Sequence, residues 1–164
     1  MKSKKFLAIA GIFSLAVFSI GLAAIGADTQ SVTATVTPKN ISVTVSPGSV
    51  DYGTVAINTE SAPSVIITAS NNGNVAENFN IKGSNSTNWT LSDTAAGADT
   101  FMHKFAKSGD SYAAYTALHN TNYTALATAV GTSGSQLFKL KLITPTSTAT
   151  YAQQSTTVTI QATE

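Results

Sequence analysis

Hydrophobic and polar residues alternate along most of the chain beyond residue 27, in short stretches separated by Gly, Pro, Asn and Ser. A period of two is typical of strands that bury one face and expose the other. No long stretch beyond residue 27 has the period of a helix, although residues 123–130 are ambiguous. The strands are expected at residues 31–37, 41–45, 65–69, 78–82, 89–91, 101–105, 138–142 and 158–162.

This pattern predicts an all-β domain of seven to nine strands over residues 28–164, the size of an immunoglobulin-like β-sandwich. A closed barrel would show the same alternation, and the sandwich is the favoured interpretation. Asn72-Gly73 predicts a tight hairpin turn. It would join the apolar strand at residues 65–69 to the strand that carries Phe79 and Ile81.

The first 27 residues have a different character. The opening MKSKK is basic, and residues 6–27 contain no charged side chain. A basic start, an apolar run and a small-residue end are typical of a secretory signal peptide, with cleavage after Ala23 or Ala27. The run is also long enough to span a bilayer as a hydrophobic helix. A cleaved signal is favoured, with an uncleaved membrane anchor or a pilin-like assembly helix as alternatives. Each places residues 28–164 at the cell surface or in the extracellular space.

Charge and composition narrow the function classes. The chain has nine lysines, no arginine and no cysteine. Beyond residue 27, six lysines face eight acids, which gives a formal charge of 6 − 8 = −2. This balance excludes nucleic acid as a partner, because phosphate recognition requires clustered Lys and Arg. Without cysteine, the domain must be stabilised by packing and backbone pairing alone.

Four stretches resemble known proteins. The run ISVTVSPGSVDYGTVAINTESAPSVIITASNNGN (residues 41–74) is similar to the opening of many extracytoplasmic immunoglobulin-like domains. The stretches FNIKGSNSTNWTL, DTFMHKF and LKLITPTSTATYAQQSTTVTIQAT resemble parts of uncharacterised secreted single-domain bacterial surface proteins. The resemblance covers most of residues 28–164 and implies an immunoglobulin-like β-sandwich. It implies no activity, because a fold alone does not supply a function.

The sequence contains no constellation of catalytic residues. No hydrolase, zinc-protease, P-loop or dinucleotide motif occurs, and there are two histidines. His103 lies between Phe101 and Phe105 on one strand face, where we expect a core histidine with a hydrogen-bond partner. His119 is expected in a solvated loop. We therefore expect a protein that is not an enzyme, without catalytic residues, cofactor or metal site.

Other residues are candidates for contact or modification. Tyr112, Tyr115 and Tyr123, in Ser- and Ala-rich surroundings, are candidates for an exposed patch that contacts a ligand or partner. Trp89 is expected to fill the core. Four Asn-x-Ser/Thr triplets are candidate glycosylation sites, although about three would occur by chance in this composition. These are Asn40, Asn85, Asn88 and Asn122.

Residues 28–38 suggest a mode of assembly. Val32, Ala34 and Val36 alternate with Thr before Pro38. The simplest interpretation is the first strand of a self-contained domain. The alternative is a donor strand that pairs with a sheet edge of the next subunit, where alternate side chains fill pockets.

These observations favour a non-enzymatic structural protein, a self-assembling subunit of a filament, pilus-like fibre or coat. Its expected partners are other copies of itself, other surface proteins or glycans. An adhesin or carbohydrate-binding module that uses the tyrosine-rich loop is the alternative. The membrane would be a partner only through residues 6–27, if these are not cleaved.

Overall fold

A computed structural model describes residues 28–164 and shows nine strands, one 3-10 turn (η1, Ser108–Asp110) and, within these residues, no α-helix. The all-β prediction is confirmed. The hydrophobic helix expected within residues 6–27 lies outside the described residues. The strands are β1 (Val43–Ser46), β2 (Ile67–Asn71), β3 (Glu77–Lys82), β4 (Thr90–Leu91), β5 (Thr100–Lys107), β6 (Thr116–Ala117), β7 (Thr124–Val130), β8 (Ser135–Ile143) and β9 (Thr159–Thr163).

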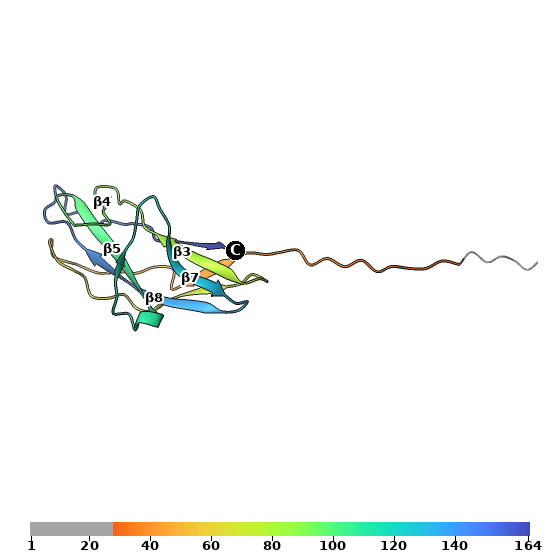
Figure 1. The fold of residues 1–164 in the computed structure, drawn as a ribbon. Coiled ribbons are helices and arrows are strands. Elements are labelled where there is room, and N and C mark those ends of the chain that lie inside the picture. The colour runs from red at the N-terminus through yellow and green to blue at the C-terminus, as the bar shows by residue number, and fades with distance from the viewer. Residues whose placement is uncertain (1–27) are drawn as a thin grey trace, which may run out of the picture. The chain divides into compact units, whose positions relative to one another are not determined.

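The strands form two sheets (Figure 1). The first sheet has six strands in the order β1-β2-β8-β5-β4, with β6 also paired to β5. The second has three strands in the order β7-β3-β9. Only β4 and β5 pair in parallel, and all other pairs are antiparallel. Most neighbours are far apart in sequence, so the domain depends on long-range backbone pairing.

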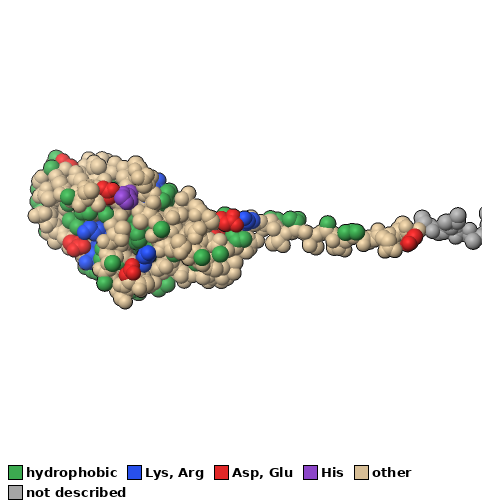
Figure 2. Space-filling view, in the orientation of Figure 1, with side chains coloured by type: hydrophobic (Ala, Val, Ile, Leu, Met, Phe, Trp, Pro, Cys, Tyr) green, Lys and Arg blue, Asp and Glu red, His purple; other side chains and the backbone are tan. Residues whose placement is uncertain are grey.

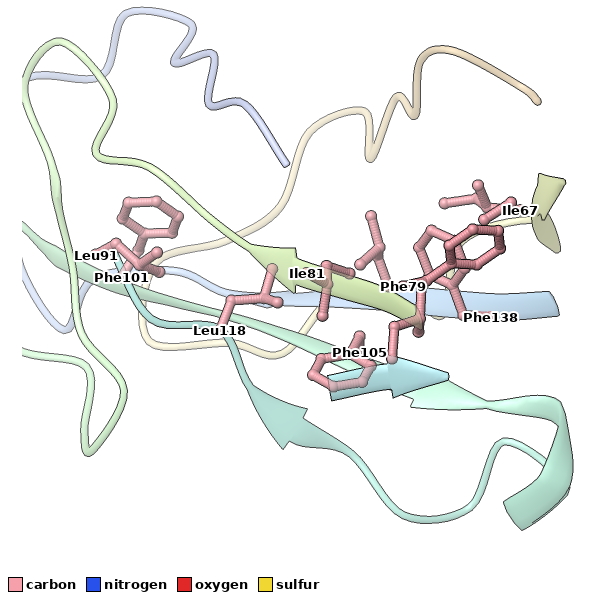
Figure 3. Packing of buried hydrophobic residues seen from close by; sticks show 11 residues of the cluster. Ile67, Phe79, Ile81, Leu91, Phe101, Phe105, Leu118 and Phe138 are labelled. Carbon is pink, nitrogen blue, oxygen red and sulfur yellow. The ribbon is translucent and has the colours of Figure 1, made fainter. Parts of the chain in front are cut away.

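One hydrophobic core is shared by both sheets (Figure 3). Phe79 and Ile81 of the second sheet and Phe138 of the first are at most 1% exposed. The two-residue period of the sequence produces this core, because alternate side chains of a strand point to the same face. Trp89, expected inside the core, is only half-buried, and its ring packs on Phe101 with 6.2 Å between centroids.

The turn at Asn72-Gly73 does not close a hairpin, so this prediction is wrong. Strands β2 and β3 belong to different sheets, and the chain between them crosses from one sheet to the other. The buried Asn71 fixes the crossing, because its side-chain amide donates to the backbone carbonyls of Val75 and Val130. Asn and Gly favour a chain reversal in either situation, so these residues do not reveal whether a turn joins neighbours in one sheet.

Strand β2 begins later than predicted, because the residues before it pair with β8 in another way. Residues 58–64 run beside the end of β8, and the hydroxyls of Ser61 and Ser64 accept backbone N–H groups of that strand. Side-chain oxygens thus replace main-chain acceptors. Val65 and Ile66, predicted to lie in the apolar strand at residues 65–69, are 66% and 45% exposed.

Residues 37–164 form one compact unit, and the chain up to Val36 belongs to a separate one. No strand occurs between residues 28 and 42, so the strand predicted at residues 31–37 does not form within this chain. A strand requires a neighbour for its N–H and C=O groups. In the part of the chain that the structure describes, this segment is paired with none.

Candidate functional site

The segment of residues 28–36 is extended, and every residue in it is exposed. Val32 is 94% exposed and Val36 is 88% exposed. In an extended chain Ala34 points to the same side as these two valines. A single exposed hydrophobic residue is ordinary, but three on one side of an unpaired segment form a candidate surface for adding a strand to another sheet.

The chain enters the compact unit at residues 38–42, where it is held against the turn between β2 and β3. The N–H of Asn40 donates to the side-chain oxygen of Asn74 at 2.8 Å, and the N–H of Asn74 donates to the carbonyl of Asn40 at 3.1 Å. The side-chain amide of Asn74 also donates to the carbonyl of Pro38 at 2.8 Å. We call residues 38–42 with this turn the anchor.

Two carboxylates support the anchor. Glu77 is fully buried and its Oε1 accepts the N–H of Ser42 at 2.8 Å, while Oε2 has no partner among the described residues. Gly73 lies so close to this carboxylate that a Cβ at position 73 would overlap it. At the surface, Lys39 Nζ lies 2.6 Å from the carboxylate of Glu164, and Figure 1 shows the C-terminal strand ending beside the orange chain. The anchor therefore depends on a glycine at position 73 and an acceptor at position 77.

The sheet edges differ in regularity. Strand β9 pairs with β3 through five consecutive residue pairs without a register shift. On the other side of β3, the pairing with β7 contains two register shifts, and Ala129 has a φ of 52°. Such bulges make an edge a poor template for another strand. Strand β1 has four residues, and β4 and β6 have two each. Among the described residues, β9 therefore presents the longest regular edge.

Side chains along β9 are less well covered than those of its neighbour. Ile160 and Ala162 stand opposite Ile81 and Phe79 of β3 on the same face of the sheet. Ile81 and Phe79 are 0% exposed, whereas Ile160 and Ala162 are only half-buried. Val43 of the nearby strand β1 is also half-buried against the core. The core is therefore incompletely covered along β9.

No protein-family model, curated protein or solved structure matches this chain. The candidate site is therefore assigned from the geometry of the described residues alone. Within residues 28–164, no group of three or more His, Asp or Glu side chains is arranged to hold a metal ion. The same residues include no helix with the length and apolar character needed to cross a bilayer. Figure 2 shows few charged side chains on the visible face of residues 37–164.

His103 occupies the core position that its sequence context predicts. It is 3% exposed, and its Nε2 lies 2.9 Å from the hydroxyl of Tyr52. Burial lowers the pKa of His103 to about 4. Burial and the neighbouring Tyr115 raise the pKa of the Tyr52 hydroxyl. Both side chains are thus neutral at pH 7, and their hydrogen bond joins the loop after β1 to the core.

The three candidate tyrosines do not form one patch. Tyr112 and Tyr115 each lie beneath a lysine of β8, with Lys139 Nζ 4.9 Å and Lys141 Nζ 4.6 Å from the ring centroids. Tyr123 instead lies beneath a lysine of β3 in the second sheet, and the Nζ of that lysine is 4.8 Å from the centroid of the Tyr123 ring. Tyr112 and Tyr115 therefore share one strip of the first sheet with two cations, and Tyr123 belongs elsewhere.

The remaining candidates lie at the surface. His119 is expected to be solvated, and its Nδ1 lies 2.5 Å from the carboxylate oxygen Oδ2 of Asp93. The side-chain oxygen of Asn85 accepts the N–H of Leu91 at 2.8 Å, so this asparagine helps to hold a strand in place. All four asparagines of the Asn-x-Ser/Thr triplets are exposed: Asn40, Asn85, Asn88 and Asn122.

The sequence predicts residues 31–37 as the first strand of the domain, with strand donation as the alternative, and it gives no sign of the anchor or of the edge of β9. The stretch NNGN contains Gly73 and Asn74, yet it indicates only a turn and not what the turn holds. Glu77 gives no signal, because a buried glutamate that accepts a single backbone N–H has no motif. The half-buried state of Ile160 and Ala162 depends on what lies beyond β9, which alternation along one strand does not report.

Proposed function

We propose that this protein is a non-enzymatic structural subunit of a cell-surface filament, pilus-like fibre or coat. Residues 28–38 of one subunit add a strand to the domain of the next. The observation that carries the proposal is the alternation of Val32, Ala34 and Val36 in a segment that is fully exposed and unpaired within the described residues. Strand addition gives such a segment main-chain partners and a surface for its apolar side.

The proposal includes an immunoglobulin-like β-sandwich for residues 37–164. That fold has one sheet in the order A-B-E-D and a second that contains C and F. Assigned in chain order, β1, β2, β5 and β8 correspond to A, B, D and E, because the sheet order is β1-β2-β8-β5. Strands β3 and β9 correspond to the paired C and F strands. A core shared by both sheets supports two facing layers.

Assembly would bury apolar side chains that the single chain leaves in water. Full burial of a valine side chain contributes about 1.5–3 kcal/mol, and Val32 and Val36 are both available for burial. Backbone hydrogen bonds along the strand add to this gain, while ordering of the segment opposes it. A contact between two different surfaces of identical subunits does not close on itself, so it propagates into a chain of subunits.

The proposed cellular location rests on the sequence of the first 27 residues. A basic start and an uncharged apolar run direct the following residues across the cytoplasmic membrane, whether the run is cleaved or retained. Assembly would then take place outside this membrane. A subunit held by strand addition needs no disulfide, which is consistent with a chain that has no cysteine.

Size-exclusion chromatography and electron microscopy of the secreted protein test this function. We expect higher-order species for the full secreted chain and a folded monomer when residues 28–38 are deleted. Circular dichroism of the deletion variant provides the control for folding. A strict monomer in both cases, or assembly that survives the deletion, would overturn the proposal.

Glycan binding is a second candidate, favoured by one observation. Tyr112 and Tyr115 are half-buried, and a lysine lies over each ring, Lys139 over Tyr112 and Lys141 over Tyr115. Rings offer stacking faces for sugars, and lysines attract acidic groups. A Tyr112→Ala/Tyr115→Ala variant should lose binding to acidic glycans and keep its fold. A Tyr123→Ala variant, altered in the other sheet, should bind normally.

A further inference from the structure

We infer that the outer edge of β9 is the place that receives the donated strand, and that its occupant is residues 31–37 of a second copy of this chain. The inference rests on the proposed function and specifies the surface it uses. Alternation along residues 158–162 by itself predicts only an ordinary strand of the sheet.

The edge of β9 is regular. An edge strand presents unpaired N–H and C=O groups at every second residue, which is a template for another strand. Strand β9 keeps one register with β3 over its five residues. The stretch from Val32 to Val36 also has five residues, so donor and acceptor match in length at about 3.3 Å per residue. The bulged edge of β7 lacks this regularity.

Side chains along β9 are incompletely buried. Ile160 and Ala162 face the core side but are half-buried, although their partners across the strand pair are 0% exposed. A strand laid along β9 would place every second side chain beside them. Val32, Ala34 and Val36 have this two-residue spacing, so one set of apolar side chains would extend the core and the threonines would face water.

The order of strands also points to β9. In an immunoglobulin-like sandwich a further strand, G, lies beside F. Strand β9 occupies the F position, and among residues 28–164 no strand lies in the G position. Neither the donor segment nor β9 carries a charge that would oppose pairing. No ionisable side chain occurs in residues 29–37 or in Thr159–Thr163.

The occupant is a second copy because the required segment is present in every subunit. Val32 and Val36 are the most exposed large hydrophobic residues that the structure describes. A regular five-residue edge and a matching unpaired segment on the same chain form a heterologous pair, which links subunits head to tail. Pairing of the segment with its own β9 would satisfy the same groups in a monomer, and disulfide trapping between differently tagged chains separates the two cases.

Disulfide trapping tests the inference in a chain that has no native cysteine. One tagged population carries Thr33→Cys or Thr35→Cys on the polar side of the donor. A second population, with a different tag, carries Gln161→Cys, an exposed position on β9. The matched control carries Thr128→Cys, an exposed position on β7 at the opposite edge of the same sheet. After mixing and mild oxidation, we expect mixed disulfides with Gln161→Cys at least tenfold more abundant than with Thr128→Cys.

Two further variants identify the occupant. Val32→Asp and Val36→Asp in the donor should abolish the mixed disulfide without altering the domain. In the double variant Thr35→Cys/Gln161→Cys, an intrachain disulfide in dilute monomer would show the same chain as occupant and overturn the inference.

Failure of the inference and failure of the proposed function give different results. Equal or stronger trapping at Thr128→Cys, or none at either edge while assembly still depends on residues 28–38, overturns β9 as acceptor and leaves the function standing. Absence of both trapping and assembly overturns both.

Discussion

Two neighbouring segments of this chain have the same alternation but different surroundings. Residues 31–37 carry Val32, Ala34 and Val36, and residues 41–46 carry Val43 and Val45 in the same spacing. The second segment forms β1 and pairs with β2 through four residue pairs. The first forms no strand, and its two valines are almost fully exposed.

The difference lies in what each segment meets. Asn74 in the turn between β2 and β3 accepts the N–H of Asn40, just before the second segment. Glu77, the first residue of β3, accepts the N–H of Ser42 within it, and these bonds fix the segment beside β2. No described residue pairs with the backbone of the first segment. Alternation therefore predicts which side of a strand is apolar. It does not predict which sheet the strand joins, or whether that sheet belongs to the same copy of the chain.

Aspartate at matched positions should weaken assembly in the first segment and destabilise the domain in the second. Val36→Asp removes an apolar contact and places a charge in the proposed interface, so we expect assembly to require at least about 100-fold higher concentration. Stability of the monomer should stay within about 0.5 kcal/mol, because Val36 is exposed. Val43→Asp, at a half-buried position, should lower the free energy of unfolding by about 2 kcal/mol.

Urea unfolding and analytical ultracentrifugation measure these two quantities on the same samples. If Val36→Asp destabilised the monomer as much as Val43→Asp, the first segment would be part of the domain after all.

A methyl group at position 73 should disturb the anchor that distinguishes the second segment from the first. Gly73→Ala places a Cβ into the Glu77 carboxylate and the backbone carbonyl of Asn40. We expect a loss of about 3 kcal/mol in unfolding free energy, because a backbone atom can yield only if the anchor moves. Thermal unfolding checks this, with Gly109→Ala as control, since a Cβ at Gly109 meets nothing within 4 Å. Equal effects of both substitutions would contradict the role of the anchor.

A lower pH should reduce the stability of the domain and should not change the protonation of the first segment. Residues 29–37 contain no titratable side chain, whereas the domain contains His103 with a pKa lowered to about 4 by burial. The unfolded chain binds a proton at this histidine near pH 6.5, so stability is complete above that pH and falls as the pH drops toward 4. We expect a loss of about 2 kcal/mol between pH 7 and pH 5.

Urea unfolding of the wild type and of His103→Gln at both pH values measures this effect. Glutamine retains hydrogen-bonding groups for Tyr52, and its curve should be nearly flat over this range. An equally steep loss in the variant would show that another group is responsible.

Much of the fold follows from the sequence pattern. Period-two alternation predicts the strands that contain Phe79, Phe105 and Phe138, because each buries alternate residues in one core. The same reasoning places His103 in the core. It fails where the decisive contact is distant in sequence: Asn71 turns an expected hairpin into a crossing between sheets by bonding to Val130, which is 59 residues away.

The candidate site is only partly predictable for the same reason. Val32, Ala34 and Val36 are visible in the sequence as an apolar series, but their exposure depends on the absence of a neighbour in the described structure. The tyrosines appear as one group in sequence, yet Tyr123 lies in the second sheet and the others beside the first. The partner of a residue depends on what surrounds it in three dimensions. The sequence of a single strand gives little information about those surroundings.

Amide hydrogen exchange of residues 31–37 measures whether these residues pair with another copy. In assembled protein their N–H groups should be protected to an extent comparable with those of β9, because they would donate to a neighbouring strand. In the monomeric Val32→Asp/Val36→Asp variant the same amides should exchange at the rate of an unstructured peptide. Rapid exchange of residues 31–37 in the assembled protein would contradict strand donation.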